Sequence, residues 1–330
     1  MADPETVLVT GGSGFIGAYT AAELTHRGHG VVSYDVAPAS WGAAAVLEAL
    51  PDRPIFVRGD VADLSELIAA LREHGVTRIF HAAAVFDPPV SMRHPAPCYR
   101  VNVMGTVNVL EAARAVGIER VVMASSIAVY APRRYEPIDE AHPIATPADG
   151  NPLGPYGASK AAAELIGLTY AGTGLVDFVG LRYSGVYGFG MRYPMYVRPM
   201  VEDAVDGTPV RFETGGDMPR DYTYVVDVAR ATASALFAPR GSLAQRVFNI
   251  ATGRLTTASQ LADTVRDVLP EAEIEIGPGL TEYERSDARM RGRLTIDAAR
   301  EQLGWQPEFD LGAGIRDYAD RYRAFRAQEA

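Results

Sequence analysis

A tyrosine and a lysine stand four residues apart in the segment Tyr156-Gly157-Ala158-Ser159-Lys160. This spacing puts the phenol and the ammonium on one face of a helix. A free tyrosine titrates near 10, and a neighbouring cation favours its phenolate; lowering the pKa by about 3 units corresponds to roughly 4 kcal/mol of preferential stabilisation. A phenolate could take the proton from a substrate hydroxyl while a hydride leaves the same carbon for a nicotinamide. A surface helix pair has the same spacing, so the spacing alone fits both interpretations.

A pair of serines follows an apolar run that is typical of a buried strand. Residues 121–124 read Val-Val-Met-Ala and lead into Ser125-Ser126. We expect Ser126 to bind the substrate by a hydrogen bond to the hydroxyl whose proton Tyr156 takes. The candidate catalytic residues are therefore Ser126, Tyr156 and Lys160.

A glycine-rich turn connects a strand pattern at residues 6–10 to an apolar helical pattern near the start of the chain. Glycines let a ligand approach the backbone, and the free amides and positive dipole end of a helix favour a pyrophosphate. Glycine pairs also occur in turns that bind nothing, which leaves that alternative open. The residues expected to bind a dinucleotide here are Gly11, Gly14, Phe15, Ile16 and Gly17.

A carboxylate ends the next strand pattern, at residues 30–35. Asp35 comes about 20 residues after the turn, where an acidic side chain can accept hydrogen bonds from an adenosine ribose. The same carboxylate would repel a 2′-phosphate. The sequence therefore predicts NAD, and not NADP, as the cofactor.

The elements that must position these residues alternate between strand and helix patterns over the first 180 residues or so. Further strand patterns lie at 55–58, 78–81, 120–124 and 176–182, with helical patterns such as 64–74 and 101–116 between them. This alternation predicts an α/β fold with a doubly wound parallel sheet, a Rossmann fold, and ligands at the carboxyl ends of the strands.

The second half of the chain has shorter pieces, punctuated by glycine and proline, with helices expected near 195–205, 257–269 and 296–303. We expect residues 1–183 to form the NAD-binding domain, with 221–250 returning to it. Residues 184–220 and 251–330 would form a smaller α/β lobe that binds the substrate.

Composition limits the classes of function. A formal net charge of −10 argues against nucleic acid or an anionic membrane as a partner, because both reward clustered basic residues. The single cysteine, Cys98, excludes an internal disulfide framework, and the histidine spacing predicts no metal site. There is no leader pattern at residues 1–5 and no apolar run of the roughly 18 residues that a membrane span needs, so we expect a cytoplasmic protein.

Together these motifs resemble the NAD-dependent epimerase/dehydratase family of extended short-chain dehydrogenases/reductases, over nearly the whole chain. Besides the glycine turn and Asp35, the motifs that carry the resemblance, in order, are Gly59-Asp60-Val61, His81-Ala82-Ala83-Ala84, Asn102-Val103-x-Gly105-Thr106, Ser125-Ser126-x-Ala128-Val129-Tyr130, Tyr156-Gly157-x-Ser159-Lys160, Leu181-Arg182-Tyr183, Arg220-Asp221-Tyr222-x-Tyr224-Val225-x-Asp227 and Leu303-Gly304-Trp305-x-Pro307.

The resemblance implies roles for several of these residues. Ser126, Tyr156 and Lys160 would form a catalytic trio, and Lys160 would also contact the nicotinamide ribose. It implies a homodimer, in which the helix near 102–116 and the helix opened by Tyr156 pack against their mates. Residues that the resemblance adds to the cofactor site are Asp60 and Val61 at the adenine, Ala82, Ala83 and Ala84 along the cofactor groove, and Asn102, Tyr156 and Lys160.

Departures from the family pattern narrow the expected reaction. Ile127 and Ala128 replace the Asp-Glu pair that eliminates water in dehydratases, which argues against dehydration. Gly185 stands where epimerases usually carry an asparagine that contacts the diphosphate, so it offers the substrate no side chain. Arg220 matches the phosphate-binding arginine of the family and predicts an anionic substrate. The alternative is a structural ion pair of Arg220 with Asp221, Asp227 or another nearby carboxylate. Three other arginines, Arg192, Arg198 and Arg289, are candidates for further cationic contacts or for the solvated surface.

Three functions fit these observations. The first is a nucleotide-sugar epimerase, in which hydride leaves a sugar carbinol and returns to the opposite face. The second is a net NAD-dependent dehydrogenase of a free sugar, sugar acid or small hydroxy acid, which would suit Gly185. The third is a dinucleotide sensor without catalysis, against which the intact trio argues.

Overall fold

The computed structural model describes residues 4–86, 88–144 and 154–329. The expectation that residues 1–5 are not a leader therefore concerns three residues, 1–3, that lie outside the described ranges. Its centre is a parallel sheet of seven strands. In the order in which they lie, the strands are β11 (Val247–Ile250), β6 (Phe178–Tyr183), β5 (Arg120–Ser126), β4 (Arg78–His81), β1 (Thr6–Thr10), β2 (Gly30–Asp35) and β3 (Ile55–Arg58).

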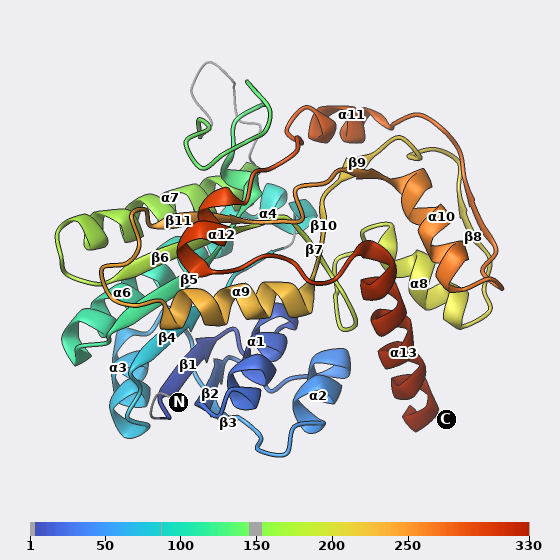
Figure 1. Ribbon diagram of the computed structural model, residues 1–330. Helices are drawn as coiled ribbons and strands as arrows, with labels where there is room; N and C mark the ends of the chain where they lie inside the picture. Colours follow the sequence, from blue (N-terminus) through green and yellow to red (C-terminus); the bar gives the residue numbers. More distant parts are fainter. Residues whose placement is uncertain (1–3, 87, 145–153, 330) are drawn as a thin grey trace.

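Helices cover both faces of this sheet (Figure 1). Side chains alternate along a strand, so that Val7 and Val9 of β1 pack in one hydrophobic core and Leu8 in another. The doubly wound fold is therefore confirmed. The helices of this part are α1 (Phe15–His26), α2 (Trp41–Glu48), α3 (Leu64–Glu73), α4 (Pro88–Arg93), α5 (Pro95–Tyr99), the π-helical turn η1 (Arg100–Met104), α6 (Gly105–Val116), the 3-10 turn η2 (Ile127–Val129), α7 (Gly154–Gly172) and α9 (Val225–Phe237).

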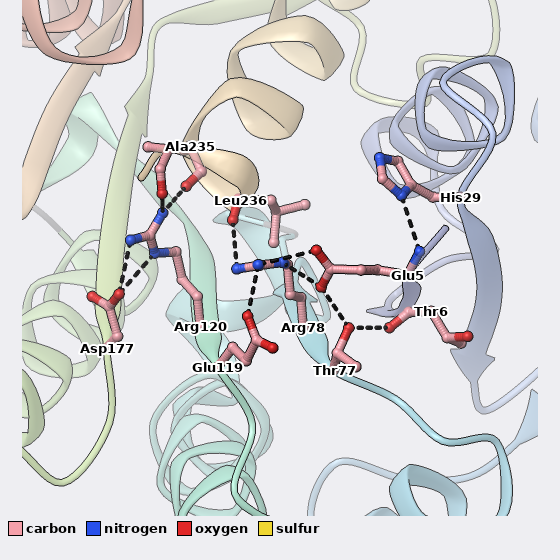
Figure 2. Close-up of polar contacts among 11 residues, drawn as sticks. Glu5, Thr6, His29, Thr77, Arg78, Glu119, Arg120, Asp177, Ala235 and Leu236 are labelled. Atoms are coloured by element: carbon pink, nitrogen blue, oxygen red, sulfur yellow. Dashed lines mark hydrogen bonds and ion pairs between the residues drawn. The ribbon is translucent and has the colours of Figure 1, made fainter. Parts of the chain in front are cut away.

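The helix α9 comes from the second half of the chain but packs against α1 and the large sheet. Two arginines on neighbouring strands hold its carboxyl end (Figure 2). Arg120, only 1% exposed, donates to the carbonyls of Ala235 and Ala238 at 2.9 and 2.6 Å, and Arg78 donates to the carbonyl of Leu236 at 3.1 Å. These bonds satisfy carbonyls that have no partner inside the helix and place positive charge at its negative dipole end.

In the described part of the chain, the remaining elements are three small two-stranded sheets and five helices. Most of them share a second core with α1, α2 and α9, whereas Ala299 and Leu303 pack in the core of the large sheet. The strands pair as β7 (Gly185–Tyr187) with β10 (Tyr222–Tyr224), β9 (Pro219–Arg220) with β12 (Thr256–Thr257), and β8 (Val210–Phe212) with β13 (Ile274–Ile276). The helices are α8 (Val197–Val205), α10 (Ala258–Val268), α11 (Glu282–Ala288), α12 (Asp297–Leu303) and α13 (Leu311–Glu329).

The long helix α13, at the carboxyl terminus in Figure 1, was not predicted. Most of its side chains are charged or exposed, but Ile315, Tyr318 and Tyr322 are buried. Their spacing of three and four residues is the signal that could have revealed the helix. Within the described ranges, no helix combines the length and the apolar character that crossing a bilayer requires.

Candidate active site

The glycine turn lies between β1 and α1 and is shaped by close backbone packing. Gly11 has a φ of +67°, and a Cβ on it would lie 2.7 Å from the amide nitrogen of Ala83. A Cβ on Gly17 would lie 2.2 Å from the carbonyl oxygen of Gly11, so a side chain fits at neither position. The buried hydroxyl of Ser13 has no hydrogen-bond partner within the described protein. This cradle, with an unused donor at the amino end of α1, fits a pyrophosphate.

The carboxylate of Asp35 lies beside this cradle. Its Oδ2 accepts a hydrogen bond from the amide of Ser13 at 3.1 Å, and its Oδ1 accepts one from the amide of Val36 at 2.8 Å. Burial raises the pKa of Asp35, and these amides act in the opposite direction. The structure therefore places Asp35, which is predicted to bind the adenosine ribose, beside the turn that is predicted to bind the pyrophosphate.

The three alanines run from the end of β4 along the glycine turn. The amide of Ala82 donates to the carbonyl of Thr10 at 3.1 Å, and the amide of Ala83 donates to the Thr10 hydroxyl at 3.3 Å. Further along the same edge of the sheet, Asp60 pairs with Arg100 at 2.9 Å, and Val61 is buried. The predicted cofactor residues thus follow the carboxyl ends of β1 to β4.

The side-chain amide of Asn102 is hydrogen-bonded to other residues of the chain. Its Oδ1 accepts from the amide of Val85 at 2.7 Å, and its Nδ2 donates to the hydroxyl of Ser159 at 2.8 Å. Ser159 in turn donates to the carbonyl of Tyr156 at 2.7 Å. The π-helical turn η1 that carries Asn102, predicted as ordinary helix, therefore links the loop after β4 to the first turns of α7.

The three catalytic candidates meet at the carboxyl end of β5. Ser126 ends that strand, and Tyr156 and Lys160 lie on α7. The ammonium of Lys160 donates to the carbonyl of Ala124 at 2.7 Å, and its Nζ lies 5.9 Å from the centre of the Tyr156 ring. The pair is therefore not a surface helix pair, because Lys160 is buried.

The protonation of this pair differs from the expectation. Burial raises the pKa of Tyr156 to about 12, with an opposing contribution from Ser126, and burial lowers the pKa of Lys160 to about 8. The expectation that Lys160 would lower the phenol pKa was therefore wrong: desolvation dominates, and the opposing contribution comes from Ser126.

A buried ion pair beneath the trio was missed by sequence reasoning. Arg182 on β6 pairs with Glu164 on α7, and Glu164 also accepts a hydrogen bond from Ser125 at 2.8 Å. The guanidinium of Arg182 lies 4.7 Å from the centre of the Tyr130 ring. This network fixes α7 against β5 and β6, the two strands nearest the catalytic side chains.

Two arginines of the second half share one carboxylate. Arg220 and Arg291 each donate to Asp287, at 2.8 and 2.6 Å. The Nε of Arg291 is buried without a hydrogen-bond partner in the described part of the chain. Glu284 also lies near Arg220, so the charges of this cluster balance, but two guanidinium groups and an unused Nε donor still suit an anionic ligand. Sequence reasoning missed Arg291, although Asp287 and Arg291 are four residues apart.

The other predicted substrate residues have local partners. Arg192 donates to the hydroxyl of Ser40 at 2.8 Å, and Arg198 pairs with Glu202 at 3.1 Å, so neither joins Arg220 at Asp287. Gly185 donates from its amide to the carbonyl of Asp221 at 3.0 Å, and a Cβ on Gly185 would lie 2.6 Å from that oxygen. The close approach of β7 to β10 therefore explains this glycine without reference to any ligand.

The fold and the site define the chain as an NAD-dependent enzyme of the short-chain dehydrogenase/reductase type. The sequence model of the NAD dependent epimerase/dehydratase family matches residues 7–251. The chain belongs to this family.

Individual relatives cover nearly the whole chain. A putative UDP-glucose 4-epimerase of Methanocaldococcus jannaschii is 32% identical and covers 94% of this chain and 96% of its own. The UDP-glucose 4-epimerase of Thermotoga maritima, solved with UDP-glucose, is 27% identical with a TM-score of 0.83, over 97% of this chain and 99% of its own. The structure of MoeE5 in complex with UDP-glucuronic acid and NAD is 28% identical with a TM-score of 0.78, over 97% and 99%.

We expect Asp35 to set the choice of dinucleotide. NAD should bind at least tenfold better than NADP, which needs only about 1.4 kcal/mol, because the carboxylate repels a 2′-phosphate and accepts hydrogen bonds from a free ribose. Asp35→Ser should narrow this gap. Titration of both dinucleotides measures it, with Asp52→Ser, on the exposed turn before β3, as the control. Equal affinities in the wild type would contradict the assignment.

Proposed function

We propose that the chain is a nucleotide-sugar 4-epimerase that acts on a UDP-hexose. The observation that carries the proposal is the placement of Ser126, Tyr156 and Lys160 beside a dinucleotide cradle, in a chain that also offers Arg220 and Arg291 to an anion. The named activities of the relatives support it. In this proposal residues 184–220 and 251–330 form the substrate lobe, and its two arginines bind the diphosphate.

The residues proposed to bind the cofactor lie at the carboxyl ends of β1 to β4. The glycine turn would hold the pyrophosphate, Asp35 the adenosine ribose, and Asp60 and Val61 would lie at the adenine. The groove would be lined by Ala82, Ala83 and Ala84. Asn102 takes a supporting role in this proposal, since its amide is already bonded to Val85 and Ser159. Ser13, with its free hydroxyl, joins the set.

The chain's own groups perform the proton chemistry. NAD, when bound, supplies the acceptor and donor of the hydride. Burial favours the neutral phenol of Tyr156, so in this proposal the charge of Lys160, held by Ala124, and the charge of the nicotinamide of bound NAD would together stabilise the phenolate. Tyr156 takes the proton from the substrate hydroxyl and returns it after the sugar has presented its other face, while Ser126 hydrogen-bonds the reacting oxygen.

The decisive experiment follows both product and cofactor. Purified protein with NAD should convert UDP-glucose to UDP-galactose, seen by NMR, without a rise in absorbance at 340 nm. Net accumulation of NADH would instead support the dehydrogenase, and neither change with any sugar of a panel would leave the sensor as the better explanation.

Arg220 is expected to anchor the anionic part of the substrate. Arg220→Ala should lower kcat/KM about thirtyfold, or about 2 kcal/mol, with little change in melting temperature because Asp287 keeps Arg291 as a partner. Arg220→Lys keeps the charge but loses the paired donors, so it should be intermediate. Arg211→Ala, which breaks a surface pair with Glu275 in the same half, is the control. Wild-type kcat/KM in Arg220→Ala would favour a neutral substrate.

We also infer a homodimer in the cytoplasm. The helices expected at the interface, α6 and α7, lie side by side, and large apolar side chains are exposed there: Met104 just before α6 and Leu165 on α7. Burying such side chains against a second copy would be favourable. Light scattering on the purified protein should give the mass of two chains; a monomer at micromolar concentration would contradict this inference.

A further inference from the structure

An aromatic pair stands next to the catalytic phenol and has no role in the chemistry proposed above. The ring of Phe86 lies 4.7 Å from the ring of Tyr156 and 5.0 Å from the ring of Tyr193, measured between centres. Phe86 is 47% exposed, an unusual state for a phenylalanine that already has two ring partners. Its exposed face is therefore available to a ligand.

The two rings come from opposite sides of the site. Phe86 follows the alanines that line the predicted cofactor groove, whereas Tyr193 lies between β7 and α8 in the second half. Tyr193 is close enough to Arg220 and Arg291 for both cations to lower the pKa of its phenol, although burial raises that pKa overall. The rings of Tyr156, Phe86 and Tyr193 thus form a row that starts at the proton-transferring phenol and extends to the half of the chain that holds the two arginines.

This row coincides with the expected path of the sugar. If the diphosphate binds Arg220 and Arg291 and a ring carbon reaches Tyr156, the hexose must lie between these points. Aromatic faces pack well against the C–H faces of a sugar, but they carry partial negative charge and offer an anion no hydrogen bond. The basic residues named in this half of the site have protein partners: Lys160 has the Ala124 carbonyl, Arg192 has the Ser40 hydroxyl, and Arg220 and Arg291 share Asp287.

We propose that Phe86, together with Tyr193, makes the site selective for a neutral hexose over a hexuronic acid. The inference rests on the proposed epimerase function and adds the class of sugar to it. A C6 carboxylate placed against the rings of Phe86 and Tyr193 would lose its hydration without gaining a hydrogen-bond partner. The hydroxymethyl group of a neutral hexose carries no charge, so its desolvation costs little. The relatives include proteins of both kinds, named for UDP-glucose and for UDP-glucuronate.

The test compares two substrates on wild type and variants, as NAD-loaded enzyme. We expect wild-type kcat/KM for UDP-glucose to exceed that for UDP-glucuronate at least thirtyfold. Phe86→Ala should reduce this ratio about tenfold, and Phe86→Leu, which keeps apolar bulk, should reduce it less. Phe56→Ala removes a phenylalanine of similar exposure from the distant strand β3 and should leave the ratio unchanged.

Binding separates this inference from the proposed function. Calorimetric titration of both UDP-sugars gives a ratio of Kd values that does not depend on turnover. A wild-type ratio that favours UDP-glucose and falls in Phe86→Ala supports the role of Phe86 even if neither sugar is epimerised, in which case only the proposed activity fails. An unchanged Kd ratio in Phe86→Ala, or a wild-type preference for UDP-glucuronate, overturns the inference.

Discussion

Replacing Tyr156 by phenylalanine should lower kcat about a thousandfold while the affinity for NAD changes less than threefold. The phenol acts on the substrate proton and not on the dinucleotide, and acid–base catalysis by one positioned group is worth about 10²–10⁴ in rate. Tyr156→Phe keeps the ring and its contact with Phe86, so folding should be unaffected. Steady-state turnover and a fluorescence titration with NAD measure the two effects separately.

Lys160→Ala provides the contrast. It removes the buried charge and, by the family resemblance, a contact to the nicotinamide ribose, so both kcat and NAD affinity should fall. If Tyr156→Phe kept more than a tenth of wild-type turnover with the chemical step rate-limiting, the base would be another group. If Lys160→Ala left NAD affinity unchanged, Lys160 would act on Tyr156 alone.

Loss of Arg120 should destabilise the fold by about 3 kcal/mol. Arg120→Met leaves the carbonyls of Ala235 and Ala238 without their donor in a buried region. It also removes one of two cations from Asp177, which Arg246 still contacts at 2.5 Å. Urea unfolding measures the cost as a shift in midpoint, with NAD held at a fixed concentration because bound ligand adds stability.

Arg246→Met is the matched control, because it removes a cation from the same carboxylate. The Arg246 side chain is 32% exposed and, unlike Arg120, bonds no carbonyl of α9, so its loss should cost less than about 1 kcal/mol. Equal costs for the two variants would show that Asp177, and not the helix end, accounts for the effect of Arg120.

The parts of the fold that sequence predicted are those with a strong local signal. The strand pattern before Gly11, the turn and the helix after it agree with β1 and α1, because glycine spacing and apolar periodicity act over a few residues. The strand predicted at 120–124 extends to Ser126, since Ser125 and Ser126 pair with Arg182 and Tyr183 of a strand far along the chain. The local sequence pattern does not reveal pairing between such distant segments.

The parts that sequence could not supply depend on burial. The direction of the Tyr156 pKa follows from desolvation, which a spacing of four residues does not reveal. Glu164 looks like a surface residue of an amphipathic helix until Arg182 is found opposite it. Arg291 and Arg289 look alike in the sequence, and the structure shows that Arg291 is the one that reaches Asp287 together with Arg220.

The return of α9 and β11 to the large sheet bears on how the protein can be made and divided. A polypeptide ending at residue 183 would lack both elements, leaving the β6 edge without its partner and the α1 surface without its cover. Unpaired edges and uncovered apolar surface promote aggregation. The large sheet can therefore be completed only after synthesis has reached Ile250. Its folding depends on contacts between segments that are far apart in the sequence. Attempts to express residues 1–183 as a free-standing NAD-binding module should yield insoluble material, whereas supplying residues 184–330 as a second chain should rescue it.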